Sequence, residues 1–437
     1  MPVDVVVGLQ RGDEGKGRFV DMMISDYDIG ARYNSGNNAG HTAVAPNGEI
    51  FKLHGLPTSI IHEGIISVVG NGTVIDPRQL IGEMETLRRQ GVEISPDNLF
   101  ISGGAHLTLP GYVLEGIKKE KSIRAQGTTK SGIAEVYAAK AARDGVRVEA
   151  INRDPNELLE ITFDNLRGQR SWLGKITSWG ENHDYQVAED YVKAAKLLGE
   201  YVTDTALFLN NKLRRKHNPA WVLAEAAQGF LLDLDQGMYP YTTSSSTTAG
   251  GVCSGLGIHT SYVRHVTGVA KAVQSHVGGG PFITEIKDQT LQDQVHGNMN
   301  ATDGERGTTT GRPRRLGYLD LPQIRRAQMI NGNEKDQDMA LTKLDWIPRF
   351  SSELKICTAY IRKGKKIDIA PDAAYKLEQS TPIYVELPNW QEDISGVRKF
   401  DDLPFNAQQY VEFIEKNTGI HISKIGVGQR RDQVIVR

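Results

Sequence analysis

The sequence of 437 residues is poor in cysteine, with only Cys253 and Cys357, which stand far apart. Two isolated cysteines argue against a disulfide scaffold or a zinc site, and they fit a reducing cytosol. No apolar run approaches the roughly 20 residues of a membrane helix. The first residues, MPVDVVVGLQ, also lack the basic and long apolar segments of a signal peptide. We therefore expect a cytoplasmic protein without a membrane partner.

An excess of one charge is also missing, because 51 Lys and Arg residues stand against 53 Asp and Glu residues. A formal net charge of −2 offers no general attraction to nucleic acid or anionic membranes, so any anion site must be local. The hydrophobic fraction of 39% and the charged fraction of 24% are ordinary for a globular protein. The length allows a large core with subdomains.

Short apolar runs separated by helical patterns predict an α/β protein. Residues 3–9 are β-branched and apolar, and a glycine-rich turn and a helical pattern follow them, as at the start of an α/β unit. We predict a central, mostly parallel, twisted sheet flanked by helices, with phosphate-binding loops at the carboxyl ends of the strands. Further strands are expected at 65–72, 98–102, 220–227, 339–345, 353–361 and 383–387, and helices at 17–27, 186–215 and 404–416.

The stretch GLQRGDEGKGRFVD at residues 8–21 combines repeated glycines with one lysine. It departs from the standard phosphate loop G-x-x-x-x-G-K-[ST], because the spacing from Gly8 to Gly15 is too long and Gly17 replaces Ser or Thr. Backbone N–H groups freed by glycines at a helix N-terminus still favour an anion, and Lys16 adds positive charge. A plain glycine turn with a solvated lysine is the alternative.

An acid in this loop and a histidine downstream suggest phosphoryl transfer. Asp13 would repel phosphate unless it binds magnesium or removes a proton from a substrate beside the phosphate. His41 ends a second glycine-containing loop, GNNAGHT at 36–42. A lone histidine is more often structural than catalytic, but this one follows Asp13 closely in the chain.

Three segments rich in Gly, Ser and Thr, at 126–132, 242–257 and 302–313, interrupt an otherwise even composition. Compact domains tolerate long loops poorly unless the loops bind something. Three such loops in one chain favour an enzyme whose site is built from loops.

The motifs GDEGKG (12–17) and NNAGHT (37–42) together resemble those of the adenylosuccinate synthetases, GTP-dependent ligases of purine and AMP biosynthesis. The resemblance implies a single domain over residues 1–437 with inserted subdomains, related to the phosphate-loop proteins. It implies a reaction that joins IMP to L-aspartate, using GTP and magnesium, through a 6-phosphoryl-IMP intermediate. It continues in family order through QGTT (126–129), YPYTTSSSTTAGG (239–251), VGGGPFITE (277–285), TTGRPRRLGYLD (309–320) and TKLD (342–345).

The resemblance assigns the chemistry to three side chains. Asp13 would take the N1 proton of IMP and face magnesium, so that the 6-oxygen can attack the γ-phosphate of GTP. His41 would hydrogen-bond the transferring phosphate, and Lys16 would neutralise charge in the transition state. The carbonyl of Gly40 would be the second magnesium ligand. The GTP phosphates would contact Gly12, Gly15, Lys16, Gly17, Gly40, His41 and Thr42.

The TKLD segment resembles the guanine-recognition turn of the family. Asp345 can accept hydrogen bonds from N1–H and the 2-amino group of guanine, donors that adenine lacks there. Lys343 can place its stem on the base. The alternative is a strand end with a polar turn. A second family turn near the C-terminus contains a serine, which is absent here, although Gly426 and Gly428 fit a tight turn.

The remaining substrates would be bound by polar loops. The segment at 305–315 would close on aspartate, with Arg312 and Arg314 binding its carboxylates and Thr309 and Thr310 adding donors. A solvated basic loop or an RNA contact is the alternative, but no aromatic residue for base stacking is interleaved. The IMP-binding residues implied by the resemblance are Asp13, Asn38, Thr129, Arg143, Gln228, Thr243 and Arg312.

Arg143 would act across a subunit interface, because its counterpart in the family completes the IMP site of the neighbouring subunit. The resemblance therefore implies a homodimer with each site completed in trans. In the sequence itself, AAKAARDGV around Arg143 looks like any helix surface.

Three departures from the family pattern bear on substrate choice. Arg11 stands in place of Trp, Asn37 in place of His, and KSGIAE at 130–135 in place of G-R-G-I-G-P. Ser131 thus replaces an arginine that helps to hold the amino-acid substrate, and Lys130 is not equivalent to arginine at a carboxylate. A paralogue that amidates another 6-oxopurine nucleotide or uses another amine, and a non-catalytic GTP-binding protein, remain alternatives.

Overall fold

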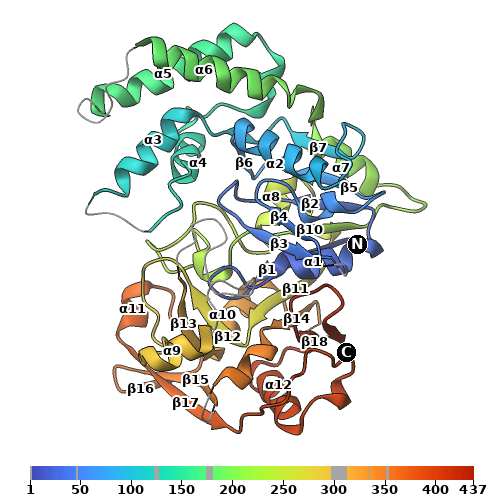
Figure 1. Ribbon diagram of the computed structural model, residues 1–437, viewed down its shortest axis with the longest axis vertical. Helices are drawn as coiled ribbons and strands as arrows, with labels where there is room; N and C mark the ends of the chain where they lie inside the picture. The colour runs from blue at the N-terminus through green and yellow to red at the C-terminus, as the bar shows by residue number, and fades with distance from the viewer. Residues whose placement is uncertain are drawn as a thin grey trace.

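A ten-stranded sheet forms the centre of the protein (Figure 1). The computed structural model describes residues 2–45, 48–122, 127–173, 181–296, 313–333, 335–350 and 354–437. The strands of the sheet lie in the order β19-β18-β14-β11-β1-β10-β2-β5-β7-β9.

The first strand, β1 (Val3–Gly8), lies in the middle of this sheet and all six of its residues are buried. It pairs in parallel with β10 (Val222–Glu225) on one side and with β11 (Val263–Lys271) on the other. A strand covered on both faces forms a nearly continuous apolar run, here interrupted by Asp4, and this pattern predicts the strand at 3–9. That predicted strand is confirmed.

The other strands of the sheet continue the parallel pattern on both sides of β1. Only β19, at one edge, is antiparallel to its neighbour among the pairs of this sheet in the described residues. The carboxyl ends of the parallel strands therefore meet along one edge of the sheet. The bounds are β2 (Ile29–Arg32), β5 (Ile66–Val69), β7 (Leu99–Ser102), β9 (Val202–Thr203), β14 (Gln337–Thr342), β18 (Ile422–Gly426) and β19 (Val434–Val436).

Helix α1 (Lys16–Met23) begins directly after the loop that follows β1. Its apolar face, formed by Phe19 and Val20, packs against Val6 and Val269 of the central strands. Full burial of such side chains contributes roughly 1.5–3 kcal/mol each. This packing fixes the N-terminus of α1 close to the carboxyl end of β1.

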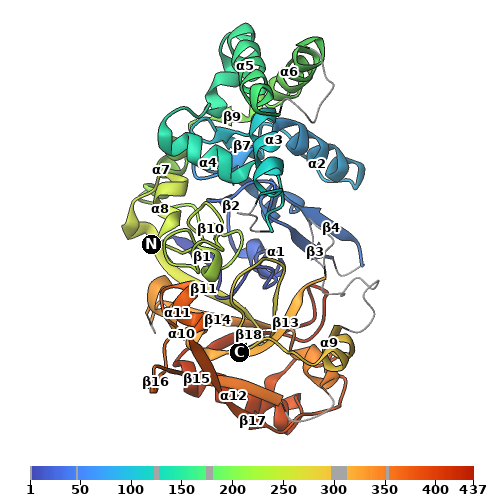
Figure 2. The ribbon, with the colours of Figure 1, turned by 90° about the vertical axis from the view of Figure 1, so that its left-hand side faces the viewer.

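A second sheet and its helices occupy one end of the molecule, as two views show (Figures 1 and 2). This five-stranded sheet contains β12 (Val273–His276), β13 (Arg315–Asp320), β15 (Leu354–Arg362), β16 (Lys365–Ile367) and β17 (Ser380–Leu387). The helices of this half are α9 (Gln289–His296), α10 (Leu321–Asn331), α11 (Ala374–Glu378) and α12 (Phe405–Thr418).

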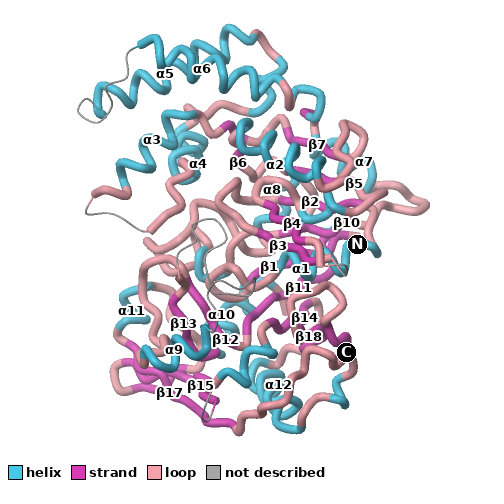
Figure 3. The backbone as a smooth tube through the Cα atoms, viewed as in Figure 1, coloured by secondary structure: helices cyan, strands magenta, loops and turns pink. Residues whose placement is uncertain are grey.

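Helices dominate the opposite end (Figure 3). In the part of the chain that the structure describes, none of them is both long and apolar enough to cross a membrane. The helices are α2 (Pro77–Arg89), α3 (Pro110–Lys119), α4 (Ile133–Ala142), α5 (Pro155–Leu173), α6 (Glu181–Lys196), α7 (Thr205–Leu213) and α8 (Gly251–Leu256). Two small ladders pair β3 (His41–Val44) with β4 (Ile50–Leu53) and β6 (Val74–Ile75) with β8 (His106–Leu107).

The predicted continuous helix at 186–215 is wrong. Helix α6 ends at Lys196, and the chain then adds the short strand β9 to the edge of the main sheet before α7 begins. The side chain of Asp204 accepts a hydrogen bond from Leu207 N and so caps α7 at its start. The predicted strands match β5, β7, β10, β14, β15 and β17, and the helix at 404–416 matches α12.

Candidate active site

The loop between β1 and α1 has a backbone that only a few residue types adopt easily. Gly12 and Gly15 have φ angles of 86° and 91°, in the left-handed region that favours glycine. Asp13 between them also has a positive φ, 56°. Gly15 is the N-cap of α1, and Lys16 is the first residue of the helix, with a buried side chain.

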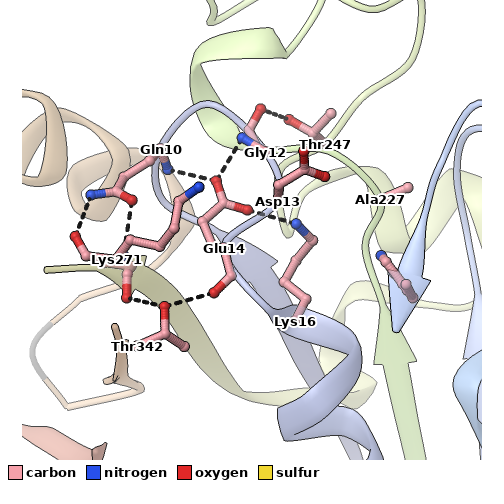
Figure 4. Close-up of polar contacts among 12 residues, drawn as sticks. Gln10, Gly12, Asp13, Glu14, Lys16, Ala227, Thr247, Lys271 and Thr342 are labelled. Carbon is pink, nitrogen blue, oxygen red and sulfur yellow. Dashed lines mark hydrogen bonds and ion pairs between the residues drawn. The ribbon is translucent and has the colours of Figure 1, made fainter. Parts of the chain in front are cut away.

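Glu14, which the sequence analysis did not single out, occupies the inside of this loop (Figure 4). Its Oε1 atom accepts hydrogen bonds from Gln10 N at 3.2 Å and Gly12 N at 2.8 Å. Its Oε2 atom lies 2.7 Å from Nζ of Lys16. Part of the anion-binding capacity expected of the loop is therefore used by an internal carboxylate. The sequence contained a signal for this internal carboxylate, because Glu14 is an acid between Gly12 and Gly15, close to Lys16.

The surroundings hold Glu14 and the loop in place (Figure 4). The hydroxyl of Thr342, at the end of β14, donates to the carbonyl of Glu14 at 2.8 Å. The side chain of Gln10 bonds the main chain of Lys271, at the end of β11, through both its oxygen and its nitrogen. A Cβ on Gly8 would overlap the Glu14 carboxylate. The loop is thus tied to neighbouring strands with its shape already formed.

Asp13 points away from this internal network and pairs with an arginine of the second half of the chain. The Oδ2 atom of Asp13 lies 2.7 Å from Nη2 of Arg314, and about a third of the Asp13 side chain is exposed. The structure therefore brings together the predicted base and one predicted aspartate-binding arginine. The other predicted residues of that loop, Thr309, Thr310 and Arg312, lie outside the described residues.

His41 opens β3 and lies beside the N-terminus of α1. A Cβ on Gly17 would stand 2.8 Å from Cβ of His41, so the glycine allows the helix to approach the histidine closely. Gly40, with a partly exposed backbone, precedes it, and the exposed Thr42 follows it. The predicted set Lys16, Gly17 and His41 is thus assembled at one helix end.

Glu225, at the end of β10, forms a buried ion pair with Nδ1 of His41. Thr58 donates to the same carboxylate from its backbone N at 2.8 Å and from its hydroxyl at 2.7 Å. Burial acts to raise the pKa of Glu225, but His41, Arg32 and Thr58 outweigh it and lower the pKa to about 2. An ionised carboxylate at Nδ1 keeps a proton on that atom and fixes the orientation of the ring. The sequence contained a signal for this role, because Glu225 is an acid within an otherwise apolar predicted strand.

Two predicted IMP residues meet through a serine. The hydroxyl of Ser35 donates to Oδ1 of Asn38 at 2.6 Å and accepts from Nε2 of Gln228 at 2.8 Å. Ser35 and Gln228 both have positive φ angles, of 72° and 59°, at the carboxyl ends of β2 and β10. Strained backbone of this kind persists where the surrounding structure holds it, commonly at binding sites.

The other predicted IMP residues lie on separate loops. Thr129 accepts a hydrogen bond from the Ser131 hydroxyl at 3.0 Å, and Thr243 donates its backbone N–H to the carbonyl of Leu232 at 2.7 Å. Arg143 lies exposed just after α4, in the helical half of the molecule.

The two predicted guanine segments follow the neighbouring parallel strands β14 and β18. Lys343, with a φ of 61°, places Nζ 3.7 Å from the ring centroid of Trp346. Burial raises the pKa of Asp345, and the nearby Lys343 opposes this rise. Gly426 ends β18, and Gly428 lies in the turn that follows.

The structure shows what the residues that depart from the family pattern contact. Arg11 donates to the carbonyl of Pro281 at 2.7 Å and lies over the ring of Phe282, so it contacts the segment 277–285. Asn37 donates to the side chain of Gln79 on α2. Ser131 bonds Thr129, and Lys130 is exposed. The position of the family arginine therefore holds only a short hydroxyl.

Magnesium fits the donors that the site offers. The Asp13 carboxylate and the Gly40 carbonyl are oxygen ligands, which this ion prefers. In the part of the chain described, no group of three or more His, Cys, Asp or Glu side chains is placed to hold a metal. An ion bound through one or two protein oxygens together with nucleotide phosphates needs no such group.

Known proteins match this sequence over nearly its whole length. A sequence model described as adenylosuccinate synthetase matches residues 5–435. The chain is 43% identical over 435 residues to the adenylosuccinate synthetase of Geobacillus kaustophilus, which covers 99% of this chain and 98% of that protein.

Similarity to solved structures extends over the whole chain. The fully ligated adenylosuccinate synthetase from Plasmodium falciparum matches with a TM-score of 0.88 and 35% identity, covering 100% of both chains. Cyanophage S-2L succinoaminodeoxyadenylate synthetase, at a TM-score of 0.61 and 19% identity over 99% of this chain and 95% of that one, shares the fold. The chain belongs to the adenylosuccinate synthetase family, whose GTP-dependent ligases join IMP to L-aspartate in AMP biosynthesis.

Proposed function

We propose that this chain carries out the family reaction with Asp13 as the base and with Lys16 and His41 at the transferring phosphate. The observation that carries the proposal is the placement of these side chains around the N-terminus of α1. A helix N-terminus favours anions, and preorganised charges there stabilise a phosphoryl-transfer transition state.

In the first step, the Asp13 carboxylate removes the N1 proton of IMP. The 6-oxygen, which gains negative charge, attacks the γ-phosphorus of GTP, and the bond to the β-γ bridging oxygen breaks to release GDP. Lys16 would exchange Glu14 for phosphate oxygens, and His41, as the imidazolium that pairs with Glu225 through Nδ1, would donate from Nε2 to the phosphate.

In the second step, the neutral amine of L-aspartate attacks C6 of the 6-phosphoryl-IMP intermediate, the bond from C6 to the phosphoryl oxygen breaks, and one amine proton passes to the departing phosphate. Hydroxide is a poor leaving group, and phosphorylation of the oxygen removes that difficulty. Arg314 would exchange Asp13 for a substrate carboxylate, with Arg312, Thr309 and Thr310 completing the aspartate site.

The GTP base would lie between the segments that follow β14 and β18. Asp345 would accept from N1–H and the 2-amino group of guanine, Lys343 would cover the base, and Gly426 and Gly428 would line the other side. Phosphate contacts would come from Gly12, Gly15, Lys16, Gly17, Gly40, His41 and Thr42. IMP contacts would come from Asp13, Asn38, Thr129, Gln228, Thr243 and Arg312.

The assembly and the metal form part of the same proposal. Magnesium, held by Asp13, the Gly40 carbonyl and phosphate oxygens, would supply charge neutralisation at the transferring phosphate. A homodimer would let Arg143 complete the IMP site of its neighbour, which suits the exposure of this arginine at the end of α4. We expect one domain over residues 1–437 with inserted subdomains, and a cytoplasmic location.

The test is product mass after incubation with GTP, magnesium, IMP and L-aspartate, with each component omitted in turn. The proposal expects adenylosuccinate, GDP and phosphate only in the complete mixture, and no turnover after chelation of magnesium. An adduct with another amine or another nucleotide would contradict the substrate assignment. GTP binding without consumption in any mixture would favour a non-catalytic role.

A further inference from the structure

Helix α1 contacts more than the phosphate loop, because its Arg18 side chain reaches the turn at 427–433. The buried guanidinium donates from Nη1 to the carbonyl of Gly428 and from Nη2 to the carbonyls of Arg430, at 3.1 Å, and Gln433. Three carbonyls of one turn therefore converge on a single arginine that stands two residues after Lys16. The planar, forked guanidinium presents five donors in a fixed geometry, which suits several acceptors on one turn.

The same turn also carries an arginine that binds helix α1. Arg431 donates from Nε and Nη2 to the two carboxylate oxygens of Asp21, at 2.7 and 2.6 Å. Asp21 is buried and also lies 2.7 Å from Nε2 of His62. Arg18 and Asp21 stand three residues apart on one face of α1, so helix and turn are joined by reciprocal charged contacts.

Gly426 leaves room for the Arg18 guanidinium. A Cβ at this position would stand 2.7 Å from Nη1 of Arg18, which is closer than real contacts allow. The φ of Gly426 lies outside the left-handed region, so space and not backbone conformation requires glycine here.

We propose that Arg18 and Asp21 are positioning residues that hold Gly426 and the turn at 427–433 as one side of the GTP base site. The helix that binds the phosphates would then also set the position of the base. This inference rests on the proposed assignment of the GTP site to the segments after β14 and β18.

Two further contacts support a role in base recognition. The backbone N–H of Arg431 donates to the carbonyl of Val44 at 3.1 Å, which joins the turn to the strand that carries His41. Burial raises the pKa of Asp345, and the Lys343 and Arg18 cations both oppose that rise. Arg18 therefore favours the ionised form of Asp345, which guanine recognition requires.

The first test is Arg18→Lys, with Arg398→Lys as the matched control. Arg398 also contacts the turn, through Asp432, but from the exposed side and without touching α1. We expect the KM for GTP to rise about tenfold in Arg18→Lys, since charge-assisted hydrogen bonds are lost. The preference for GTP over ITP, which lacks the 2-amino group, should fall by a similar factor. The KM values for IMP and aspartate should stay within twofold.

Binding measurements separate the base from the phosphates. By calorimetry, Arg18→Lys should weaken the binding of GDP about tenfold and leave the binding of inorganic triphosphate unchanged. Gly426→Ala should give the same pattern. The double variant should lose less GDP-binding free energy than the sum of the losses in the two single variants, because both changes break the same contact. Thermal unfolding confirms that each variant is folded.

Equal weakening of GDP and inorganic triphosphate would overturn the inference, as would an unchanged KM for GTP or full additivity of the two substitutions. Failure of the proposed function would look different. The wild-type chain would then make no adenylosuccinate, while the comparison of GDP with inorganic triphosphate would still test the role of Arg18.

Discussion

The Nη2 atom of Arg314 lies 2.7 Å from Oδ2 of Asp13, and the arginine is buried. The residue proposed to bind the substrate carboxylate therefore forms an ion pair with the proposed base. Binding of aspartate would release the Asp13 carboxylate by exchanging one ion pair for another. Substrate binding and activation of the base would thus be linked through one arginine.

Replacement of Asp13 by asparagine should lower kcat by at least about 100-fold, because a positioned general base typically contributes that much or more. Steady-state rates with all three substrates saturating would check this. The control is Asp26→Asn, since Asp26 is an exposed acid just beyond α1. A kcat within threefold of the wild type would rule out Asp13 as the base.

Glu225→Gln should lower kcat by about tenfold or more, because His41 would lose the carboxylate that fixes its proton on Nδ1. It should also lower the free energy of unfolding at pH 7 by roughly 3 kcal/mol, given a shift of the Glu225 pKa from 4.5 to about 2. Urea unfolding would measure this second effect.

The pH dependence of that loss has a definite sign. The folded-state pKa of Glu225 lies below the ordinary value, so its stabilisation is complete above about pH 4.5 and is lost as the pH falls towards 2. The stability gap between wild type and Glu225→Gln should therefore narrow from pH 7 to pH 3. The exposed Glu63→Gln is the control, and a gap of constant size would contradict the assignment.

Ser131→Arg should lower the KM for L-aspartate about tenfold, since a guanidinium can bind a carboxylate through two hydrogen bonds and the serine hydroxyl cannot. Titration of aspartate at saturating GTP and IMP would measure it. The KM for GTP is the internal control and should not change. An unchanged KM for aspartate would mean that other residues hold this substrate here.

Asp345→Asn should raise the KM for GTP by at least about 100-fold, because a site built to accept two hydrogen bonds from the base would present a donor instead. Initial rates with GTP and ITP would measure the loss of preference. Asp336→Asn, at an exposed acid before β14, is the control. Retention of the GTP preference would place the base elsewhere.

Much of the scaffold could be predicted from local pattern. Val3 to Gly8 form a wholly buried strand, which can be predicted from the sequence because all of its side chains except that of Asp4 are apolar or absent. Strand β9 was not predicted, because it has only two residues, Val202 and Thr203, and forms only through pairing with the distant strand β7. The break between α6 and α7 was missed for the same reason.

The site was predictable in its motifs but not in its contacts. Asp13, Lys16 and His41 stand out through glycine-rich neighbours, and Glu14 lies in the same motif, whereas Glu225 matters through partners that are distant in the sequence. The Glu225 carboxylate meets His41 and Thr58 only after β10, β3 and the short helix that begins at Thr58 fold together. No spacing along the chain encodes that meeting.

The contact between Arg18 and the turn at 427–433 also sets an order of events during synthesis. At about 5–20 residues per second, the ribosome needs roughly 20–80 s to make the chain between these two segments. The phosphate loop and its helix therefore emerge long before the turn that we place beside the base. A nascent chain would therefore hold an unfinished nucleotide site until the turn at 427–433 has been synthesised.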